Sequence, residues 1–328
     1  MKKPRHGSHR RRRWAVFFVL VACLLGLLAL TFLYQPEEGP VARVELPAVG
    51  SQPPPPEPSP ELTARTLRTR LEEVAAKYPA TYGVVVSDPS SGKTLALNAD
   101  KRFMAASLTK LPVLFTLYRA AARGEVNLED EISMLRSDVQ AYGTGVLYTR
   151  PVGYTMTLRE CAEYMIKESD NTAWKMLNRY LGRRNIEAEL YEIGARSTAY
   201  WVPNTTTPND VLLMLEAIAD PSYTTPELSA EMLDLMTHTS FEDRLPQPLP
   251  QGTRVAHKIG SYGDTFSDAG LVFPRGSRST DDAYFIVVIA GDTTEWTARS
   301  AIQDISLATY RLLGEPRARP VASVRPDA

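Results

Sequence analysis

A serine and a lysine stand three residues apart in the segment Ser-Leu-Thr-Lys at residues 107–110. On a helix, positions i and i+3 share a face, so the Lys110 amine can reach the Ser107 hydroxyl. A serine is a weak nucleophile without an adjacent base, and a lysine whose pKa is lowered by burial can be that base. An apolar run follows Lys110, which places Ser107 at the start of a predicted helix. We therefore expect Ser107 to act as a covalent nucleophile.

A second polar cluster, Ser169-Asp170-Asn171, lies in the break between predicted helices at 157–168 and 171–181. A hydroxyl at Ser169 can pass a proton to a leaving nitrogen, and the Asn171 amide can hold a substrate carbonyl. Serine, aspartate and asparagine are also the preferred residues at helix N-caps. The cluster therefore has two interpretations, a catalytic one and a purely structural one.

A third cluster closes a predicted strand at 254–259 with Lys258, Gly260 and Ser261. The lysine can attract a substrate carboxylate, and a glycine on an edge strand leaves the backbone open to a peptide-like ligand. A solvated lysine before a turn glycine is the alternative. None of the three clusters is specific by itself, since Ser-x-x-Lys also occurs at residues 90–93, in a predicted turn where the helical geometry is absent.

Together and in this order, the three clusters resemble those of the penicillin-recognising serine enzymes, whose motifs are Ser-x-x-Lys, Ser-Asp-Asn and Lys-Thr-Gly. The segments at 154–161 and at 205–208, Thr-Thr-Thr-Pro, are similar to class A β-lactamases in particular. The resemblance covers roughly residues 65–313. It implies the β-lactamase/transpeptidase-like fold and acyl transfer at a serine.

The resemblance also implies a role for each matching residue. Ser107 would be acylated, Lys110 would act as its base or proton relay, and Ser169 would carry the proton to the leaving nitrogen. Asp170 would mainly shape the loop. The residues implied in substrate binding are Asn171 for the amide, Lys258 for a carboxylate, Gly260, and Ser261, whose backbone N–H would form the oxyanion hole with that of Ser107.

Two departures from the family's pattern bear on the reaction. Ile259 stands where a hydroxyl residue is expected, which removes one hydrogen bond to a substrate carboxylate if the side chain faces the site. The glutamate that activates water for deacylation in class A β-lactamases has no counterpart between residues 194 and 209, where neither Asp nor Glu occurs. We interpret Glu187, Glu189 and Glu192, on a preceding helix, as surface residues. The acyl-enzyme is therefore expected to form and to turn over slowly.

The pattern along the chain predicts an α/β protein of the α+β type. Helical spacing from 61 to 78 precedes a hairpin, a helical stretch runs from 105 to about 219, and strands return at 254–259, 269–273 and 283–290 before a last helix. This order predicts one antiparallel sheet of about five strands, built from both ends of the domain and flanked by helices. The helical stretch forms an inserted all-helical subdomain.

Composition divides the chain into five segments. Residues 1–13 carry seven basic residues and no acid, and 14–34 are uncharged and long enough to span a membrane. We expect a cytoplasmic N-terminus, a single-pass transmembrane anchor at 14–34 and a catalytic domain outside the cytoplasm. Nine prolines make 35–60 a semi-rigid linker. The serine hydrolase domain would span 61–313, followed by a disordered tail at 314–328.

Alternatives to the anchor are a cleaved signal peptide and a lipoprotein, since the residues before Cys23 resemble a lipobox. Apolar sequence continues past Cys23, which favours the anchor. Cys161 lies in an apolar helical pattern and is interpreted as a buried core thiol. Removing the seven N-terminal bases from 37 leaves 30 basic against 38 acidic residues, a balance unlike that of a nucleic-acid-binding domain.

The sequence thus predicts a membrane-tethered serine hydrolase that acts on a β-lactam or a cell-wall (peptidoglycan) peptide. A penicillin-binding D,D-peptidase is a second enzymatic alternative. A non-catalytic module that binds cell wall is a third, although a pure binder needs no Ser-x-x-Lys. Neither a metal nor an organic cofactor is implied, and the four histidines show no metal-ligand spacing.

Overall fold

A computed structural model describes residues 60–277 and 279–314, with side chains from residue 65 onward. The chain divides into two units, Met1–Pro56 and Glu57–Ala328, and all the described residues belong to the second. The predicted basic segment, anchor, linker and tail lie outside the described residues, except for Pro60 and Gly314 at their borders. Among the helices that the structure describes, none has the length and apolar character needed to cross a membrane.

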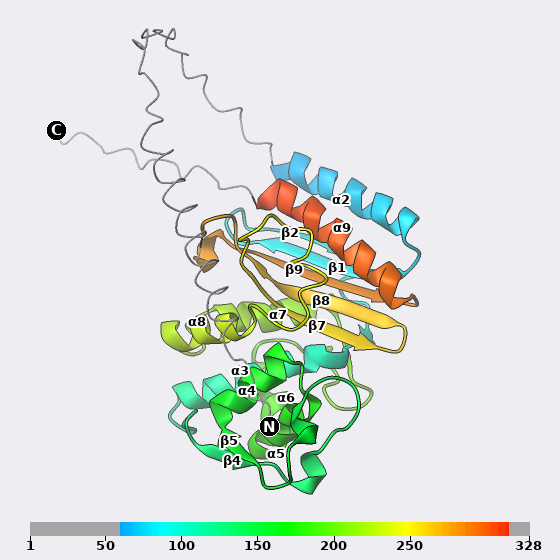
Figure 1. Cartoon of the computed structure of the whole chain (residues 1–328). Helices are drawn as coiled ribbons and strands as arrows, with labels where there is room; N and C mark the ends of the chain where they lie inside the picture. Colours follow the sequence, from blue (N-terminus) through cyan, green and yellow to red (C-terminus); the bar gives the residue numbers. More distant parts are fainter. Residues whose placement is uncertain (1–59, 278, 315–328) are drawn as a thin grey trace, which may run out of the picture. The chain divides into compact units, whose positions relative to one another are not determined.

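One antiparallel sheet of five strands forms the centre of the domain, in the order β2-β1-β9-β8-β7 (Figure 1). The two N-terminal strands form a hairpin, and the three C-terminal strands complete the sheet beside β1. The strands are β1 (Thr81–Asp88), β2 (Lys93–Leu97), β7 (Val255–Tyr262), β8 (Thr265–Val272) and β9 (Tyr284–Gly291). Because β7 is an edge strand, one side of its backbone is left without a strand partner.

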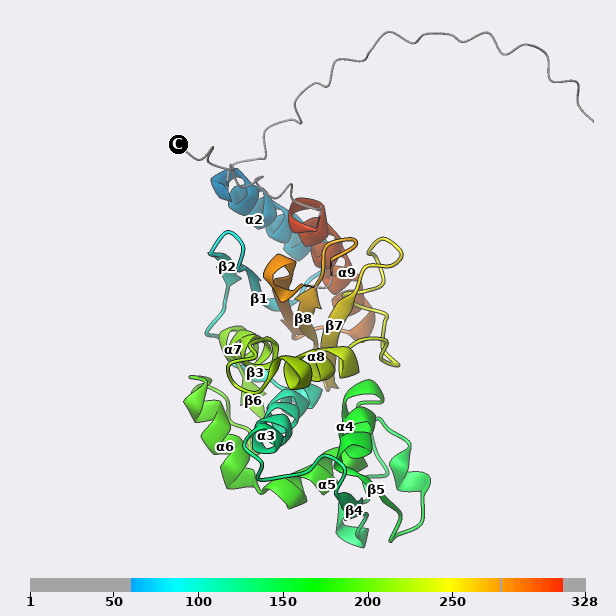
Figure 2. The ribbon, with the colours of Figure 1, turned by 90° about the vertical axis from the view of Figure 1, so that its left-hand side faces the viewer.

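Helices α2 (Pro60–Lys77) and α9 (Glu295–Leu313) lie side by side on one face of the sheet (Figures 1 and 2). The two helices come from opposite ends of the domain. Their apolar side chains, among them Leu71 and Ile302, pack with Val84, Ile286 and Val288 of the central strands in one buried cluster. Burial of this apolar surface joins the two ends of the domain.

The other face of the sheet is covered by α7 and α8, beyond which a group of four helices forms the inserted subdomain (Figure 2). The two helices on the sheet are α7 (Pro208–Ala219) and α8 (Pro226–Leu235). The four helices of the subdomain are α3 (Lys110–Ala122), α4 (Leu158–Lys167), α5 (Asn171–Leu181) and α6 (Arg183–Glu192). A single large cluster of buried side chains runs from the sheet into this subdomain. The predicted α+β architecture, a five-stranded antiparallel sheet with a helical insert, is confirmed.

Short elements that have no sequence periodicity were not predicted. They form two small antiparallel pairs, β3 (Phe103–Met104) with β6 (Thr205–Thr206) and β4 (Glu131–Ser133) with β5 (Thr155–Thr157). Strands of two or three residues are too short for an alternation of polar and apolar residues to be recognised. The β3–β6 pair is relevant to the site because it ties the segment before Ser107 to the residues before α7.

Candidate active site

The turn that carries Ser107 is a 3₁₀ helix, η1 (Ala106–Thr109), which leads directly into α3. Ala106 has a φ of +50°, a left-handed conformation that a residue with a Cβ adopts only when its surroundings enforce it. From the first turn of α3, Lys110 Nζ donates hydrogen bonds to Ser107 Oγ at 2.8 Å and to Asn171 Oδ1 at 2.8 Å. The predicted contact between serine and lysine is therefore present in the structure.

The environment of Lys110 favours its uncharged form. The side chain is buried, and desolvation lowers its pKa to about 7 even though the charge of Asp170 acts in the opposite direction. Among the described residues, Lys110 has no ion pair with a carboxylate. A neutral amine at 2.8 Å from a serine hydroxyl can accept its proton, as general-base catalysis requires.

Ser169 and Lys258 form a second hydroxyl–amine pair. Lys258 Nζ donates to Ser169 Oγ at 2.9 Å, across the boundary between the helical subdomain and the edge strand β7. Both side chains are buried. Burial lowers the pKa of Lys258 well below its usual value, the nearby Lys110 lowers it further, and Asp268 opposes the shift. The site therefore contains two hydroxyl–amine pairs near the N-termini of α3 and α5, Ser107 with Lys110 and Ser169 with Lys258.

Asp170 builds the loop that presents its neighbours Ser169 and Asn171. Its carboxylate caps α5 by accepting the N–H groups of Thr172 and Ala173, and it also accepts the N–H groups of Val146 and Leu147. The structural interpretation of this cluster is confirmed, because Asp170 is the N-cap of α5. Its neighbours Asn171 and Ser169 contact Lys110 and Lys258, and their catalytic roles stay predictions.

The loop before α5 supports Asn171 from the other side. Asn171 Nδ2 donates to the carbonyl of Tyr142 at 3.1 Å. Since Oδ1 accepts from Lys110, both polar atoms of the Asn171 side-chain amide are hydrogen-bonded. Gly145, at φ +112°, lies so close to Asp170 that an added Cβ would stand 2.3 Å from the carboxyl carbon of Asp170. Only a glycine allows the loop to approach the N-cap this closely.

Strand β7 packs against the turn that carries Ser107, and Gly260 makes this approach possible. A Cβ at Gly260 would lie 2.5 Å from Ser267 Oγ and 3.0 Å from the carbonyl oxygen of Ala105. The alternation of the strand places Lys258 and Gly260 on the face toward the helical subdomain. Ile259 is buried and alternates to the opposite face, so its side chain does not lie beside that of Lys258.

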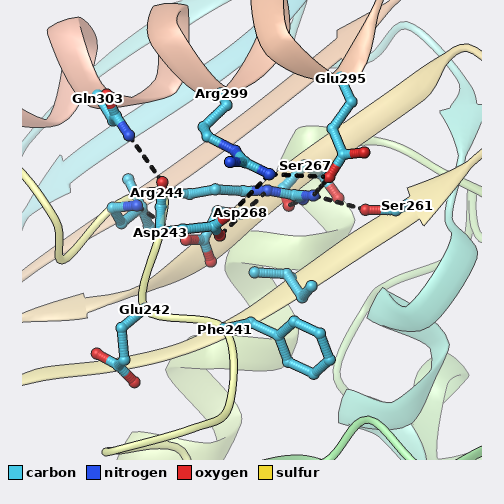
Figure 3. Close-up of polar contacts among 12 residues, drawn as sticks. Phe241, Glu242, Asp243, Arg244, Ser261, Ser267, Asp268, Glu295, Arg299 and Gln303 are labelled. Carbon is cyan, nitrogen blue, oxygen red and sulfur yellow. Dashed lines mark hydrogen bonds and ion pairs between the residues drawn. The ribbon is translucent and has the colours of Figure 1, made fainter. Parts of the chain in front are cut away.

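Arg244 is a site residue that the sequence did not reveal. It comes from the irregular segment 236–254, and its buried guanidinium runs alongside the end of β7 (Figure 3). Arg244 Nη2 donates to Ser261 Oγ at 2.6 Å, and Nη1 donates to the carbonyl oxygens of Gly260 at 3.0 Å and Ser267 at 2.6 Å. No periodicity or motif marks an arginine in such a segment, so no sequence signal could have identified it.

Two further sequence interpretations can be compared with the structure. Cys161 is fully buried, and desolvation raises the pKa of its thiol, as expected for a core residue. Glu189 was wrongly interpreted as a surface residue. It is buried between α3 and α6, where its carboxylate pairs with Arg119 and, at 2.8 Å, with Arg123. The position of Glu189 in the sequence could not reveal these two partners, of which Arg119 lies in the last turn of α3 and Arg123 is the C-cap of that helix.

Comparisons with known proteins agree with this geometry. The model of a protein family described as "Beta-lactamase enzyme family" matches residues 66–313 of the chain. The chain is 27% identical over 223 residues to "Beta-lactamase 3" of Bacillus cereus, covering 62% of this chain and 68% of that protein. It is 27% identical over 271 residues to a β-lactamase of Streptomyces fradiae, covering 75% and 84% of the two chains.

Solved structures give the same result. PBP-A has a TM-score of 0.69 and 26% identity, covering 78% of this chain and 97% of that protein. A variant of PBP-A has been solved as an acyl-enzyme complex with penicillin G. A β-lactamase of Sphaerobacter thermophilus follows with a TM-score of 0.67 and 26% identity, covering 76% and 97% of the two chains. With its fold, its serine–lysine geometry and a match over most of its length, the chain belongs to the Beta-lactamase enzyme family, whose members are serine hydrolases.

Proposed function

We propose that this protein forms an acyl-enzyme on Ser107 with β-lactams or with cell-wall peptides. The observation that carries the proposal is the contact between Ser107 Oγ and the buried amine of Lys110, whose pKa of about 7 leaves a large neutral fraction at neutral pH. Penicillin G bound as an acyl group to a PBP-A variant supports the same class of substrate for this chain.

In the acylation step, Ser107 Oγ attacks the substrate carbonyl while its proton passes to Lys110. The new C–O bond gives a tetrahedral intermediate, whose oxyanion would accept the backbone N–H groups of Ser107 and Ser261. Such preorganised donors are worth about 3–4 kcal/mol each. The intermediate collapses by breaking the C–N bond, and the leaving nitrogen takes the proton of Ser169. Lys258, whose Nζ contacts Ser169 Oγ, returns a proton to this hydroxyl, and the proton that Lys110 took from Ser107 then restores Lys258, so that the net transfer is from Ser107 to the leaving nitrogen.

Two cations flank strand β7 at one end of the site, Lys258 on the side of the helical subdomain and Arg244 on the side of α9, and together they favour a carboxylate there. Lys258 Nζ donates a hydrogen bond to Ser169 Oγ, and Arg244 Nη2 donates one to Ser261 Oγ. Arginine presents a planar fork of donors that matches a carboxylate in geometry as well as in charge. β-Lactams and peptides that end in a free carboxylate both carry this group next to the bond that is cleaved. We therefore infer a carboxylate-bearing acyl donor.

Deacylation is proposed to be slow. The segment from 194 to 209 contains no acidic residue that could activate water, and the described contacts of Lys110 include no carboxylate. Glu189, an acidic residue on the helix before this segment, forms ion pairs with Arg119 and Arg123. An acyl-enzyme without a base for water should persist, which is the behaviour of a penicillin-binding protein. The D,D-peptidase alternative is favoured by the same observation.

Labelling with a fluorescent penicillin tests the proposal. The wild-type chain should take up one label per molecule, and Ser107→Ala should take up none. Ser90→Ala is the matched control, because it removes the serine of the second Ser-x-x-Lys segment, which lies in a turn where Ser90 Oγ donates to Asp88. Labelling that survives in Ser107→Ala contradicts the proposal, because another residue then reacts. Absence of labelling from the wild type with several β-lactams also contradicts it and supports the non-catalytic binding module.

Incubation with a peptide that ends in D-Ala-D-Ala separates the two enzymatic alternatives. Release of D-alanine identifies a D,D-peptidase, whereas its absence together with penicillin labelling leaves β-lactams as the substrate class.

We also propose that the domain is held outside the cytoplasm by a transmembrane anchor at residues 14–34. The support is the uncharged stretch of 21 residues that follows seven basic ones. This location agrees with a cell-wall peptide as substrate, because such peptides lie outside the cytoplasmic membrane.

A further inference from the structure

Asp268 is a fully buried carboxylate at the middle of β8 that has no place in the acylation steps above. The alternation of β8 puts its side chain on the same face as Phe266 and Val272, which pack in the cluster beneath α2 and α9. Asp268 therefore lies behind the active site. A buried charge is retained in a fold only where it is paired and hydrogen-bonded.

The Asp268 carboxylate connects the two segments that carry the cations of the site. It lies 2.8 and 3.1 Å from Nδ1 of His257, the residue before Lys258 on β7. It also accepts the backbone N–H of Leu245, the residue after Arg244, at 3.0 Å. One side chain thus holds the neighbours of both Lys258 and Arg244.

His257 has a carboxylate at each ring nitrogen, which favours the doubly protonated imidazolium. Asp268 faces Nδ1, while Glu242 faces Nε2 at 3.3 Å, with Thr239 Oγ1 at 3.5 Å. Burial alone would lower the pKa of His257, but the charge and hydrogen bond of Asp268, together with Glu242, raise it to about 9. His257 and Asp268 therefore form a buried ion pair at neutral pH.

The backbone around Arg244 is also held from the side of α9 (Figure 3). Gln303 Nε2 donates to the carbonyl of Asp243 at 2.8 Å, and Ser306 Oγ donates to the carbonyl of Leu245 at 2.7 Å. Arg299 pairs with the Asp243 carboxylate at 2.9 Å. With α9 fixing one side of this segment, Asp268 ties the backbone next to Arg244 to the sheet, in addition to the direct contacts of Arg244 and Glu242 with β7.

We propose that Asp268 is a positioning residue, which sets the separation of Arg244 and Lys258 and thereby the preference for a carboxylate-bearing acyl donor. This inference rests on the proposed function. Arg244 Nη2 reaches Ser261 Oγ at 2.6 Å, and Lys258 Nζ reaches Ser169 Oγ at 2.9 Å, from segments that Asp268 holds together. The charge of Asp268 also favours the cationic form of both residues, against their burial.

The test compares acylation of the full chain by benzylpenicillin and by its methyl ester, which lacks the carboxylate. The wild type should react faster with the free acid. In Asp268→Asn, the amide can still accept the Leu245 N–H but carries no charge for His257, and the acid-to-ester rate ratio should fall about tenfold or more. The matched control is Glu189→Gln, a buried carboxylate in the helical subdomain, which should leave the ratio unchanged.

A merely structural role predicts a different result. If Asp268→Asn lowers the melting temperature and slows both reactions equally, so that the ratio is unchanged, the positioning role is overturned. If Asp268→Asn does not fold, His257→Gln takes its place, because glutamine keeps a donor for Asp268 without the charge. The same loss of discrimination is then expected, and an unchanged ratio overturns the inference.

Failure of the proposed function gives a distinct outcome. If neither penicillin labels the wild type, the acyl-transfer proposal is wrong, and crystal structures of the wild type and Asp268→Asn decide the positioning role. The contact of Arg244 with Ser261 or that of Lys258 with Ser169 should then be lost in the variant. Retention of both contacts overturns the inference.

Discussion

Lys110 is the residue on which the proposed acylation depends most, because it touches both the nucleophile and Asn171. The spacing of Ser107 and Lys110 predicted their contact, since three residues on a helix bring two side chains to one face. The lowered pKa could not be predicted in this way. It arises from burial by elements that are distant in sequence, and the same is true of the contacts of Arg244 and Asp268.

Replacing the base with a permanently charged side chain should abolish its function while preserving length. In Lys110→Arg, the guanidinium cannot accept the Ser107 proton at neutral pH, and the acylation rate constant should fall about 10²–10⁴-fold. Stopped-flow or gel-based labelling with a fluorescent penicillin measures this rate. An acylation rate within a factor of about two of the wild type would show that another group takes the proton.

The pH dependence of acylation follows from the same residue. Lys110 acts as a base only when neutral, and its pKa of about 7 means that the neutral fraction falls about tenfold per pH unit below that value. The acylation rate constant should therefore rise with pH, with an apparent pKa near 7, and then level off. Measurement of single-turnover labelling from about pH 5 to 9 tests this. A rate that is flat across this range argues against a neutral Lys110 as the base.

At the scale of elements, the site is the meeting point of a 3₁₀ turn, a helix N-terminus and an edge strand. Helical spacing and strand patterns predicted α3, α5 and β7, with boundaries within a few residues of those observed. The segment 236–254 has no helix or strand, and no sequence pattern predicts that it lies beside β7. Its position depends on tertiary contacts, such as that of Asp268 with Leu245, which no local pattern encodes.

A change at the contact between β7 and η1 should affect the reaction through geometry alone. In Gly260→Ala, the added Cβ would meet Ser267 Oγ at 2.5 Å and the Ala105 carbonyl at 3.0 Å, which pushes β7 away from the nucleophile. A displacement of about 1 Å can cost about 10² in rate, so acylation should slow by about that factor.

The matched control for this substitution is Gly291→Ala on β9 of the same sheet. The nearest atom to an added Cβ there is Phe103 Cδ1 at 3.4 Å, which is close to ordinary contact. Acylation by Gly291→Ala should stay near the wild-type rate. Equal rates for Gly260→Ala and the wild type would mean that β7 does not position the reacting groups.

At the scale of the whole molecule, segments from the two ends of the domain pack together in one sheet and one helix pair. The hairpin β1–β2 and the strands β7 to β9 share one sheet, and α2 packs on α9. The order of helical and strand patterns predicted this arrangement, because a helical insert between two strand regions leaves them free to pair. The helical subdomain then carries Ser107, Ser169 and Asn171 to the edge of the sheet that carries Lys258.

The proposed anchor predicts the distribution of the chain between cell fractions. The full chain should remain with membranes after washing at high salt, whereas a chain consisting of residues 61–313 should be soluble and should still be labelled by penicillin. Immunoblotting of the two fractions measures this. Cys23→Ala separates anchor from lipoprotein by the size of the membrane-bound chain, which should stay unchanged for an anchor and increase for a lipoprotein, because cleavage before Cys23 is then lost. A full chain found only in the soluble fraction contradicts membrane tethering.

The most direct test of the account is a time course of the intact mass of the wild-type chain after mixing with benzylpenicillin. We predict a mass increase of one penicilloyl group, mapped by peptide analysis to Ser107, which persists after the excess penicillin has been removed. Absence of an adduct, or an adduct on another residue, would contradict acylation at Ser107. An acyl group that is lost faster than about 10 s⁻¹, a typical enzymatic turnover rate, would contradict slow deacylation.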